Sequence, residues 1–393
     1  MRALPAVDAA EYTLYNRILL CLPPRLPRIN QQTNCMENIF HLPSLTPPPI
    51  VPRDLAYILE NTERLWPELR GKQIFITGGT GFFGCWLLES FLAANAAFNL
   101  RSQAVVLTRS PEKFRLRAPH LTGNPSIQLL EGDVRDFAFP SGEFPFIIHA
   151  ATESVRKQTF HPSDELATIA DGARRCLEFA ESHRTAKFLL TSSGAVYGRQ
   201  PSSITHLAED YRAAPDARHP NYAYAEGKRI AERLCAESAT RSGMESKIAR
   251  CFAFVGPHLP LDAHFAIGNF IRDALLGNPI EIRGDGTPRR SYLYAADLAI
   301  WLWTMLFRAP SLRPLNVGSD HDLSIRELAE AVASVIRPGL AIRVAQEAVP
   351  GDPIQRYVPS VEAAKKKLNL AEGVSLTDAI RRTAKWHRPQ LDL

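Results

Sequence analysis

The sequence lacks the features that mark membrane, disulfide-rich or nucleic-acid-binding proteins. No apolar run approaches the ~20 residues that span a bilayer, so we expect no membrane segment. The six cysteines are scattered, without a CxxC pair or a Cys/His cluster at metal-ligand spacing. This spacing is typical of a reducing cytoplasm and predicts no metal site. The net charge of +5 is modest and no basic run contains interleaved aromatics, so nucleic acid is not an expected partner.

The N-terminal stretch also lacks any sustained helical or strand period. Many of the 30 prolines lie there, in "CLPPRLPRIN" and "HLPSLTPPPIVPR". We expect residues 1–52 to be a disordered Pro-rich tail rather than an ordered docking segment. The run "ILLCL" is too short and too late for a signal peptide. Met36 offers an alternative start, which would place residues 1–35 outside the protein.

From residue 53 onward the sequence alternates between strand and helix patterns. A short amphipathic helix, "RDLAYILENTERLWPELRG", leads into a series of apolar strands. The strands are "KQIFIT", "AVVLT", "SIQLLE", "PFIIH" and "AKFLLTSS". Alternation of this kind predicts an α/β protein with a Rossmann-type doubly wound parallel sheet. We expect an NAD(P)-binding domain over 53–252 and a mainly substrate-binding α/β region over 253–393, from which the chain crosses back to the sheet.

A glycine-rich turn, "GGTGFFG" at 78–84, joins the first strand to an apolar helix. Glycines allow the backbone to turn tightly and approach a pyrophosphate, whose charge then lies at the positive N-terminus of the helix. The strand–turn–helix context makes the motif far more specific than glycine spacing alone. We therefore expect a dinucleotide to contact Gly78, Gly81, Phe82, Phe83 and Gly84.

The residues after the second strand bear on cofactor choice. An NAD site usually has an acid there to bind the ribose 2′-hydroxyl, whereas this chain has Thr108-Arg109-Ser110. Arg109 and a hydroxyl can hold a 2′-phosphate, which favours NADP over NAD, and both remain open. Four further cofactor contacts are expected at the ends of the third and fourth strands, at Asp133, Val134, Ala151 and Thr152.

Two tyrosines in "NYAYAEGK", Tyr222 and Tyr224, precede Lys228. Tyr224 and Lys228 are spaced i, i+4 and share one face of a helix, whereas Tyr222 points elsewhere. A neighbouring ammonium, together with an oxidised nicotinamide, would lower the pKa of a phenol towards the operating pH. We therefore assign acid–base chemistry to Tyr224, assisted by a serine hydroxyl after the fifth strand.

These motifs in their order resemble the extended short-chain dehydrogenase/reductase family, which contains nucleotide-sugar epimerases and dehydratases. The resemblance covers roughly residues 72–385. It implies that Tyr224 is the acid/base at a sugar hydroxyl, that Lys228 holds the nicotinamide ribose, and that Ser193 of "TSSGAVYG" is the catalytic and substrate-binding hydroxyl. It also implies that Arg290 of "GDGTPRRSY" grips the substrate diphosphate, with Arg356 of "IQRYVPS" a second candidate.

The chain departs from the family pattern at positions that bear on the reaction. Dehydratases of the family have an Asp-Glu pair directly after the catalytic hydroxyl and sugar-acid decarboxylases keep a Glu, whereas this chain has Gly194 and Ala195. Ala253 also replaces a usual Asn. We expect an enzyme that acts at C4 of a nucleotide-diphosphate sugar through a 4-keto intermediate, as an epimerase.

The alternatives are an NADPH-dependent 4-keto-sugar reductase and a 4,6-dehydratase. Outside catalysis, a dinucleotide-binding sensor would keep the fold, but intact Ser193, Tyr224 and Lys228 argue against it. By family likeness we expect a cytoplasmic homodimer associating through helices like 222–240.

Overall fold

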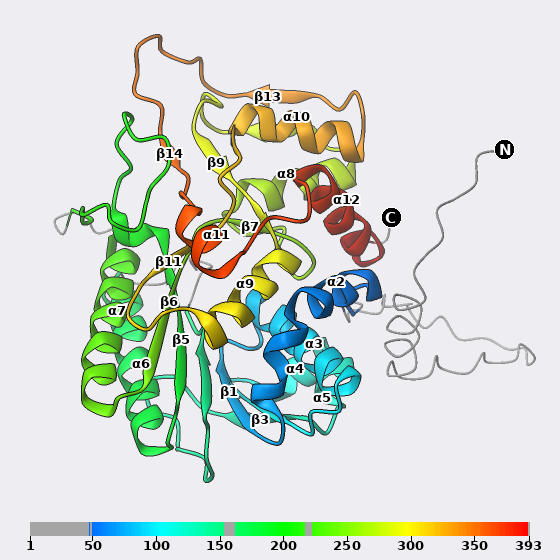
Figure 1. Cartoon of the computed structure of the whole chain (residues 1–393). Coiled ribbons are helices and arrows are strands. Elements are labelled where there is room, and N and C mark those ends of the chain that lie inside the picture. The colour runs from blue at the N-terminus through cyan, green and yellow to red at the C-terminus, as the bar shows by residue number, and fades with distance from the viewer. Residues whose placement is uncertain (1–46, 48, 153–161, 217–221, 392–393) are drawn as a thin grey trace, which may run out of the picture.

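A seven-stranded parallel sheet forms the centre of the computed structural model, which describes residues 47, 49–152, 162–216 and 222–391 (Figure 1). The strand order is β11-β6-β5-β4-β1-β2-β3, and every neighbouring pair is parallel. The sheet strands are β1 (Gln73–Thr77), β2 (Gln103–Thr108), β3 (Ile127–Glu131), β4 (Phe146–His149), β5 (Lys187–Ser193), β6 (Glu245–Cys251) and β11 (Leu315–Val317). The predicted doubly wound parallel sheet is confirmed.

Helices cover both faces of the sheet because alternate strand residues point to opposite sides. One face carries α6 (Pro162–Ser182) and α7 (Ala223–Ser242), which lie side by side in Figure 1. The other face packs against α3 (Phe82–Ala97), α4 (Pro111–Arg117), α5 (Pro119–Thr122) and α9 (Ala295–Arg308). Within β1, Phe75 packs in the core between the sheet and α6–α7, whereas Ile74 and Ile76 pack in the core on the opposite face, under α3 and α9.

The C-terminal region lies beyond the carboxyl ends of the strands, at the top of Figure 1. The chain returns to the sheet as β11, which pairs with β6. The small strands of this region are β7 (Phe254–Val255), β8 (Ile280–Ile282), β9 (Arg289–Ser291), β10 (Leu293–Tyr294), β12 (Asp322–Ser324), β13 (Ile342–Val344) and β14 (Arg356–Tyr357). Its helices are α8 (Ala266–Leu276), α10 (Ile325–Ile336), α11 (Glu362–Leu368), α12 (Leu376–His387) and the 3₁₀ turn η4 (Arg388–Gln390).

The lead-in to the first strand is already part of the core. Most of the predicted 1–52 tail lies outside the described residues, but Ile50 is buried. The predicted helix follows as α2 (Pro52–Thr62) and the 3₁₀ helix η1 (Glu63–Leu69). Asp54 of α2 is fully buried, accepts a hydrogen bond from Tyr294 and pairs with Arg382 of α12. The ordered core therefore begins slightly before the boundary predicted at residue 53.

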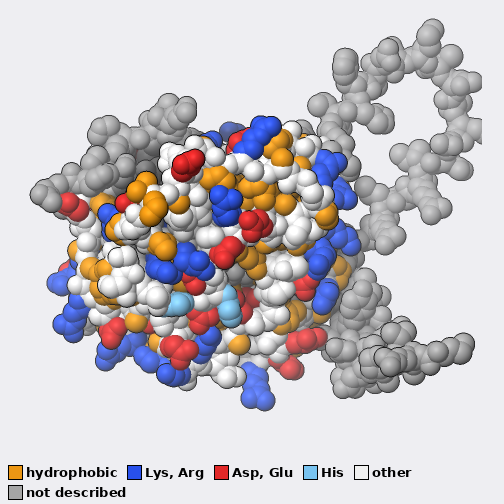
Figure 2. All heavy atoms as spheres, turned by 90° about the horizontal axis from the view of Figure 1, so that it is seen from above, with side chains coloured by type: hydrophobic (Ala, Val, Ile, Leu, Met, Phe, Trp, Pro, Cys, Tyr) orange, Lys and Arg blue, Asp and Glu red, His pale blue; other side chains and the backbone are white. Residues whose placement is uncertain are grey.

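The surface carries charges of both signs. On the face shown in Figure 2, basic and acidic side chains are interspersed with apolar ones. Within the described ranges no helix combines the length and apolar character that a bilayer crossing requires.

A buried ionic cluster ties the lead-in to the helix that follows the glycine turn. Glu89 of α3 accepts the backbone N–H of Ile50 with both carboxylate oxygens, at 3.0 and 3.1 Å. Its Oε1 also lies 3.1 Å from His120 Nε2 and 3.4 Å from His258 Nε2. Burial opposes the charged form of His258, but contacts with Cys85 and Glu89 outweigh it and raise its pKa to about 9.

We expect His258 to make stability depend on pH. A folded pKa of about 9 exceeds the ordinary value of 6.5. The protonated ring therefore contributes roughly 2–3 kcal/mol that is fully present below pH 6.5 and lost as the pH rises through about 9. His258→Gln should lower the unfolding free energy at pH 6, with a deficit that shrinks above pH 9, in urea titrations at several pH values. The control His321→Gln, at a highly exposed ring, should leave the profile unchanged, and a pH-independent deficit for His258→Gln would refute the ionic role.

Candidate active site

The glycine turn between β1 and α3 has no room for side chains at three of its positions. A Cβ at Gly79 would lie 2.5 Å from the Val106 side chain. Gly78 has a φ of +71°, and a Cβ there would lie 2.4 Å from the Ala150 carbonyl oxygen. A Cβ at Gly84 would lie 2.3 Å from the backbone of Gly79. At Gly81, by contrast, the nearest atom would be the Gly78 oxygen at 3.3 Å. Gly78 and Gly84 therefore close the turn, while Gly81 faces space in front of the helix N-terminus.

The two phenylalanines of the turn begin α3. Both are partly buried, and Phe83 packs edge-on against Phe254 at a centroid distance of 5.0 Å. No acidic side chain occupies the first turn of α3. The start of this helix therefore suits an anion, as the predicted pyrophosphate contact requires.

The end of β4 lies beside the turn and is held by a buried polar contact. Thr77 Oγ1 lies 2.8 Å from His149 Nδ1 and accepts the N–H of Ala151 at 3.1 Å. Burial, with the nearby Lys228 charge, lowers the pKa of His149 to about 3, so the ring is neutral. Among the described residues, the buried Thr152 hydroxyl has no hydrogen-bond partner. An orphaned hydroxyl here fits a ribose or amide group of a bound dinucleotide.

The remaining cofactor candidates lie at the ends of β2 and β3. Arg109 is exposed directly after β2, and its charge helps to lower the pKa of Asp133, whose main partner is the bidentate Arg135. Val134 packs against α6, since a Cβ on Gly172 would lie 2.9 Å from its side chain. The structure thus gathers the predicted cofactor residues around one end of the sheet, and the residues present fit a dinucleotide.

Ser193, Tyr224 and Lys228 come together at the neighbouring strand end. Ser193 is the last residue of β5, and its hydroxyl lies close enough to Tyr224 to lower the pKa of the phenol. Lys228 lies one turn after Tyr224 on α7, with Nζ 5.8 Å from the Tyr224 ring centroid. The buried Lys228 ammonium donates to the Thr191 carbonyl at 2.8 Å. The shared helix face predicted for Tyr224 and Lys228 is therefore present.

The pKa values of Tyr224 and Lys228 differ from the lowered phenol pKa that we expected from the sequence. Burial raises the pKa of the Tyr224 phenol, and the lowering contact is the Ser193 hydrogen bond. Burial also lowers the pKa of Lys228 to about 8. Desolvation of the buried groups therefore dominates, contrary to the lowered phenol pKa that we expected from the sequence.

One residue of this cluster was not predicted from the sequence. Tyr357 of β14 places its hydroxyl 3.4 Å from Ser193 Oγ. Its ring stacks on Phe252, with centroids 4.7 Å apart. A strand of two residues has no detectable period, so only the tertiary structure brings Tyr357 to Ser193.

The two candidate diphosphate arginines lie on opposite faces of a small sheet, β12-β9-β14. Arg290 pairs in register with Tyr357, and Arg356 with Arg289. Paired residues share a face, so Arg290 lies on the Tyr357 side. Arg356 bonds Asp322 on the other side at 3.0 Å. Arg290 is partly buried and donates to the Arg289 carbonyl at 2.8 Å. It forms no ion pair with another described residue, so it is the better placed anion ligand.

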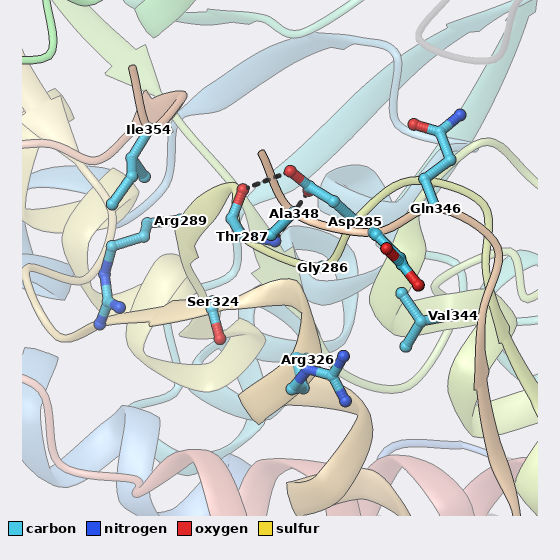
Figure 3. Close-up of a pocket in the computed structure, with 11 residues that line it drawn as sticks. Asp285, Gly286, Thr287, Arg289, Ser324, Arg326, Val344, Gln346, Ala348 and Ile354 are labelled. Carbon is cyan, nitrogen blue, oxygen red and sulfur yellow. Dashed lines mark hydrogen bonds between the residues drawn. The ribbon is translucent and has the colours of Figure 1, made fainter. Parts of the chain in front are cut away.

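A cavity of about 480 Å³ lies among the outer elements of the C-terminal region (Figure 3). Its lining includes Asp285, Thr287, Arg289, Arg326 and Gln346. Because Arg289 points to the face opposite Arg290, this cavity is separate from the hydroxyl cluster.

The geometry of the turn predicts that Gly81→Val abolishes dinucleotide binding without unfolding the protein. The new side chain would enter the space in front of α3, with its Cβ in a tight contact of 3.3 Å with the Gly78 carbonyl oxygen. Isothermal titration with NAD⁺ and NADP⁺ should show no binding, while the melting temperature stays close to that of the wild type. Gly84→Ala, which clashes with the Gly79 backbone, should instead lower the melting temperature. Unchanged affinity in Gly81→Val would refute the site.

Comparisons with known proteins identify the family of this chain. The model of the NAD dependent epimerase/dehydratase family matches residues 74–318. UDP-glucuronic acid decarboxylase 3 of Arabidopsis thaliana is 30% identical over 327 residues, covering 81% of this chain and 91% of the relative. UDP-glucuronic acid decarboxylase 6 of the same plant is 29% identical, covering 85% and 93%.

Solved structures share the fold at lower identity. UDP-glucose 4-epimerase from Thermotoga maritima has a TM-score of 0.66 at 18% identity, covering 81% of this chain and 99% of that one. A dTDP-glucose 4,6-dehydratase from Streptomyces venezuelae, solved with NAD, has a TM-score of 0.68 at 23% identity, covering 80% and 97%. From the family match and the identity to its relatives, the chain belongs to the NAD-dependent epimerase/dehydratase family and is a nucleotide-sugar enzyme of that family.

Proposed function

We propose that this protein oxidises and re-reduces C4 of a nucleotide-diphosphate sugar, and so inverts that centre as a 4-epimerase. The observation that carries the proposal is the meeting of Ser193, Tyr224 and Lys228 beside the glycine turn. The Arg290 guanidinium near the same cluster forms no ion pair with another described residue and suits a substrate diphosphate.

Each side chain has a distinct task in this proposal. Tyr224 accepts the proton of the C4 hydroxyl, and Ser193 hydrogen-bonds the same oxygen. Lys228 keeps a positive charge close to the phenol and is held in place by the Thr191 carbonyl. A bound nicotinamide would supply the acceptor for the hydride that leaves C4. Returning the hydride to the other face of a 4-keto sugar gives the epimer.

The surroundings of Gly194 favour epimerisation over dehydration. A dehydratase needs an acid and a base near C5 and C6, and Gly194 and Ala195 supply neither. A Cβ at Gly194 would lie 2.6 Å from the Phe252 ring. That ring is packed against Tyr357 and cannot shift freely. The space that an Asp side chain would need is therefore filled.

The relatives favour a uridine diphosphate sugar as substrate and supply a second candidate reaction. Both Arabidopsis relatives are named for the decarboxylation of UDP-glucuronic acid. That reaction class also suits a site that oxidises C4, because a 4-keto group activates the neighbouring carboxylate for loss. Ala195 stands where the family's decarboxylases keep a Glu, so epimerisation remains the leading proposal.

We expect Tyr224→Phe to lose turnover and keep binding. The variant retains the ring but removes the proton acceptor, so kcat should fall by roughly 10²–10⁴ with little change in substrate affinity. Epimerisation of UDP-glucose and UDP-N-acetylglucosamine deuterated at C4 would be followed by mass spectrometry. In the wild type the deuterium should pass through the cofactor and return to C4, while a label at C5 stays.

Tyr222→Phe is the matched control and should turn over at close to the wild-type rate. Loss of the C5 label together with a 4-keto-6-deoxy product would show that the protein is a dehydratase and not an epimerase. Release of carbon dioxide from UDP-glucuronic acid, without epimerisation of the neutral sugars, would show that it is a decarboxylase.

We further propose that Arg109 and Ser110 bind a 2′-phosphate and favour NADP. Arg109→Asp should shift the ratio of NADP⁺ to NAD⁺ affinity towards NAD⁺ by at least about tenfold, or 1.4 kcal/mol. Calorimetric titration with both dinucleotides measures the ratio. Arg135→Gln is a control for the loss of a nearby exposed cation. Tighter binding of NAD⁺ by the wild type would contradict the assignment.

A further inference from the structure

The Ser193 hydroxyl has three polar neighbours. Its oxygen accepts the backbone N–H of Ala195 at 3.1 Å. It lies 3.4 Å from the Tyr357 hydroxyl of β14, and it is close enough to the Tyr224 phenol of α7 to lower the pKa of that group. Two elements distant from Ser193 in the sequence therefore converge on one small side chain.

A serine hydroxyl has one proton to donate and two lone pairs that accept. Ala195 can only donate, so it occupies one lone pair. One lone pair and one proton remain for the two tyrosines. Either Tyr357 donates a hydrogen bond to Ser193 and Ser193 donates one to Tyr224, or Tyr224 donates to Ser193 and Ser193 donates to Tyr357. Only the first arrangement supports a Tyr224 oxygen that must carry negative charge before it accepts a proton.

We propose that Tyr357 is a positioning residue, whose hydroxyl donates to Ser193 Oγ and thereby directs the Ser193 proton to the Tyr224 oxygen. This inference rests on the proposed acid–base role of Tyr224. The O···O distance of 3.4 Å is longer than an optimal hydrogen bond. Catalytic contacts of this kind commonly tighten when the ligands bind.

The fold holds Tyr357 in place for this task. Its ring is stacked on Phe252, and β14 is paired to β9. The next residue, Val358, donates its N–H to Gln200 at 3.0 Å and accepts from Leu207 at 2.9 Å. Tyr357→Phe preserves all of these contacts and removes only the hydroxyl.

Other groups also face Tyr224 and set the background for its titration. Lys228 lies on the same helix, Glu165 on α6, and Cys251 on β6. Arg290 faces Tyr357 from β9. None of these side chains is altered in Tyr357→Phe. The charge of an ionised Tyr357 itself raises the pKa of Tyr224, so its loss alone would lower that pKa, and an upward shift would report on the hydrogen bond through Ser193.

The test is a spectroscopic titration of the full chain, saturated with UDP and with NAD⁺ or NADP⁺, whichever binds more tightly. Tyrosinate absorbance is followed against pH in the wild type, and the step lost in Tyr224→Phe is assigned to Tyr224. Tyr357→Phe should move that step upward by at least about half a pH unit, a roughly threefold weaker acid. In a Ser193→Ala background, Tyr357→Phe should cause no further shift. Tyr211→Phe removes a hydroxyl elsewhere and should leave the step in place.

The outcomes separate this inference from the function on which it rests. If Tyr224→Phe removes no tyrosinate step below the ordinary range, the acid–base role of Tyr224 fails, and the inference fails with it. A Tyr224 step that is present but unmoved in Tyr357→Phe overturns only the role of Tyr357. An equal shift in the Ser193→Ala background overturns the route through Ser193.

Discussion

Parallel pairing of β1, β4 and β5 is the constraint on which the rest of the site depends. The register aligns Thr77 with His149 and His149 with Leu190, so the three strands end at one edge. Each strand contributes one part of the site at this edge. These parts are the glycine turn after β1, the Ala151–Thr152 pair after β4, and the Ser193 hydroxyl at the end of β5. A sheet with parallel strands places its ligands at this edge because the connecting helices begin there.

A second, smaller sheet completes the site from the C-terminal region. Its two faces have different chemistry, because neighbouring residues of β9 and β14 alternate. Arg290 and Tyr357 share the face towards the hydroxyl cluster, whereas Arg289 and Arg356 are neutralised by Asp322 on the other. One short strand can therefore contribute both an anion ligand and a structural ion pair.

The fold does not select among the reactions of this family. Proteins of closely similar architecture are named as epimerases and dehydratases, and the sequence relatives as decarboxylases. What differs between such enzymes is a small number of groups around the sugar. In this chain Phe252 packs over Gly194, and the Tyr357 hydroxyl lies 3.4 Å from Ser193 Oγ.

The sequence by itself determined the parallel α/β fold, the glycine turn, and the helical pairing of Tyr224 with Lys228. Each of these depends on residues close together in the chain, where local periodicity and spacing carry the information. Only the tertiary structure decided that Tyr357 reaches Ser193, that Arg356 faces away from Arg290, and that burial raises the pKa of Tyr224. Those outcomes depend on contacts between distant segments and on desolvation, which arise only when the chain is packed.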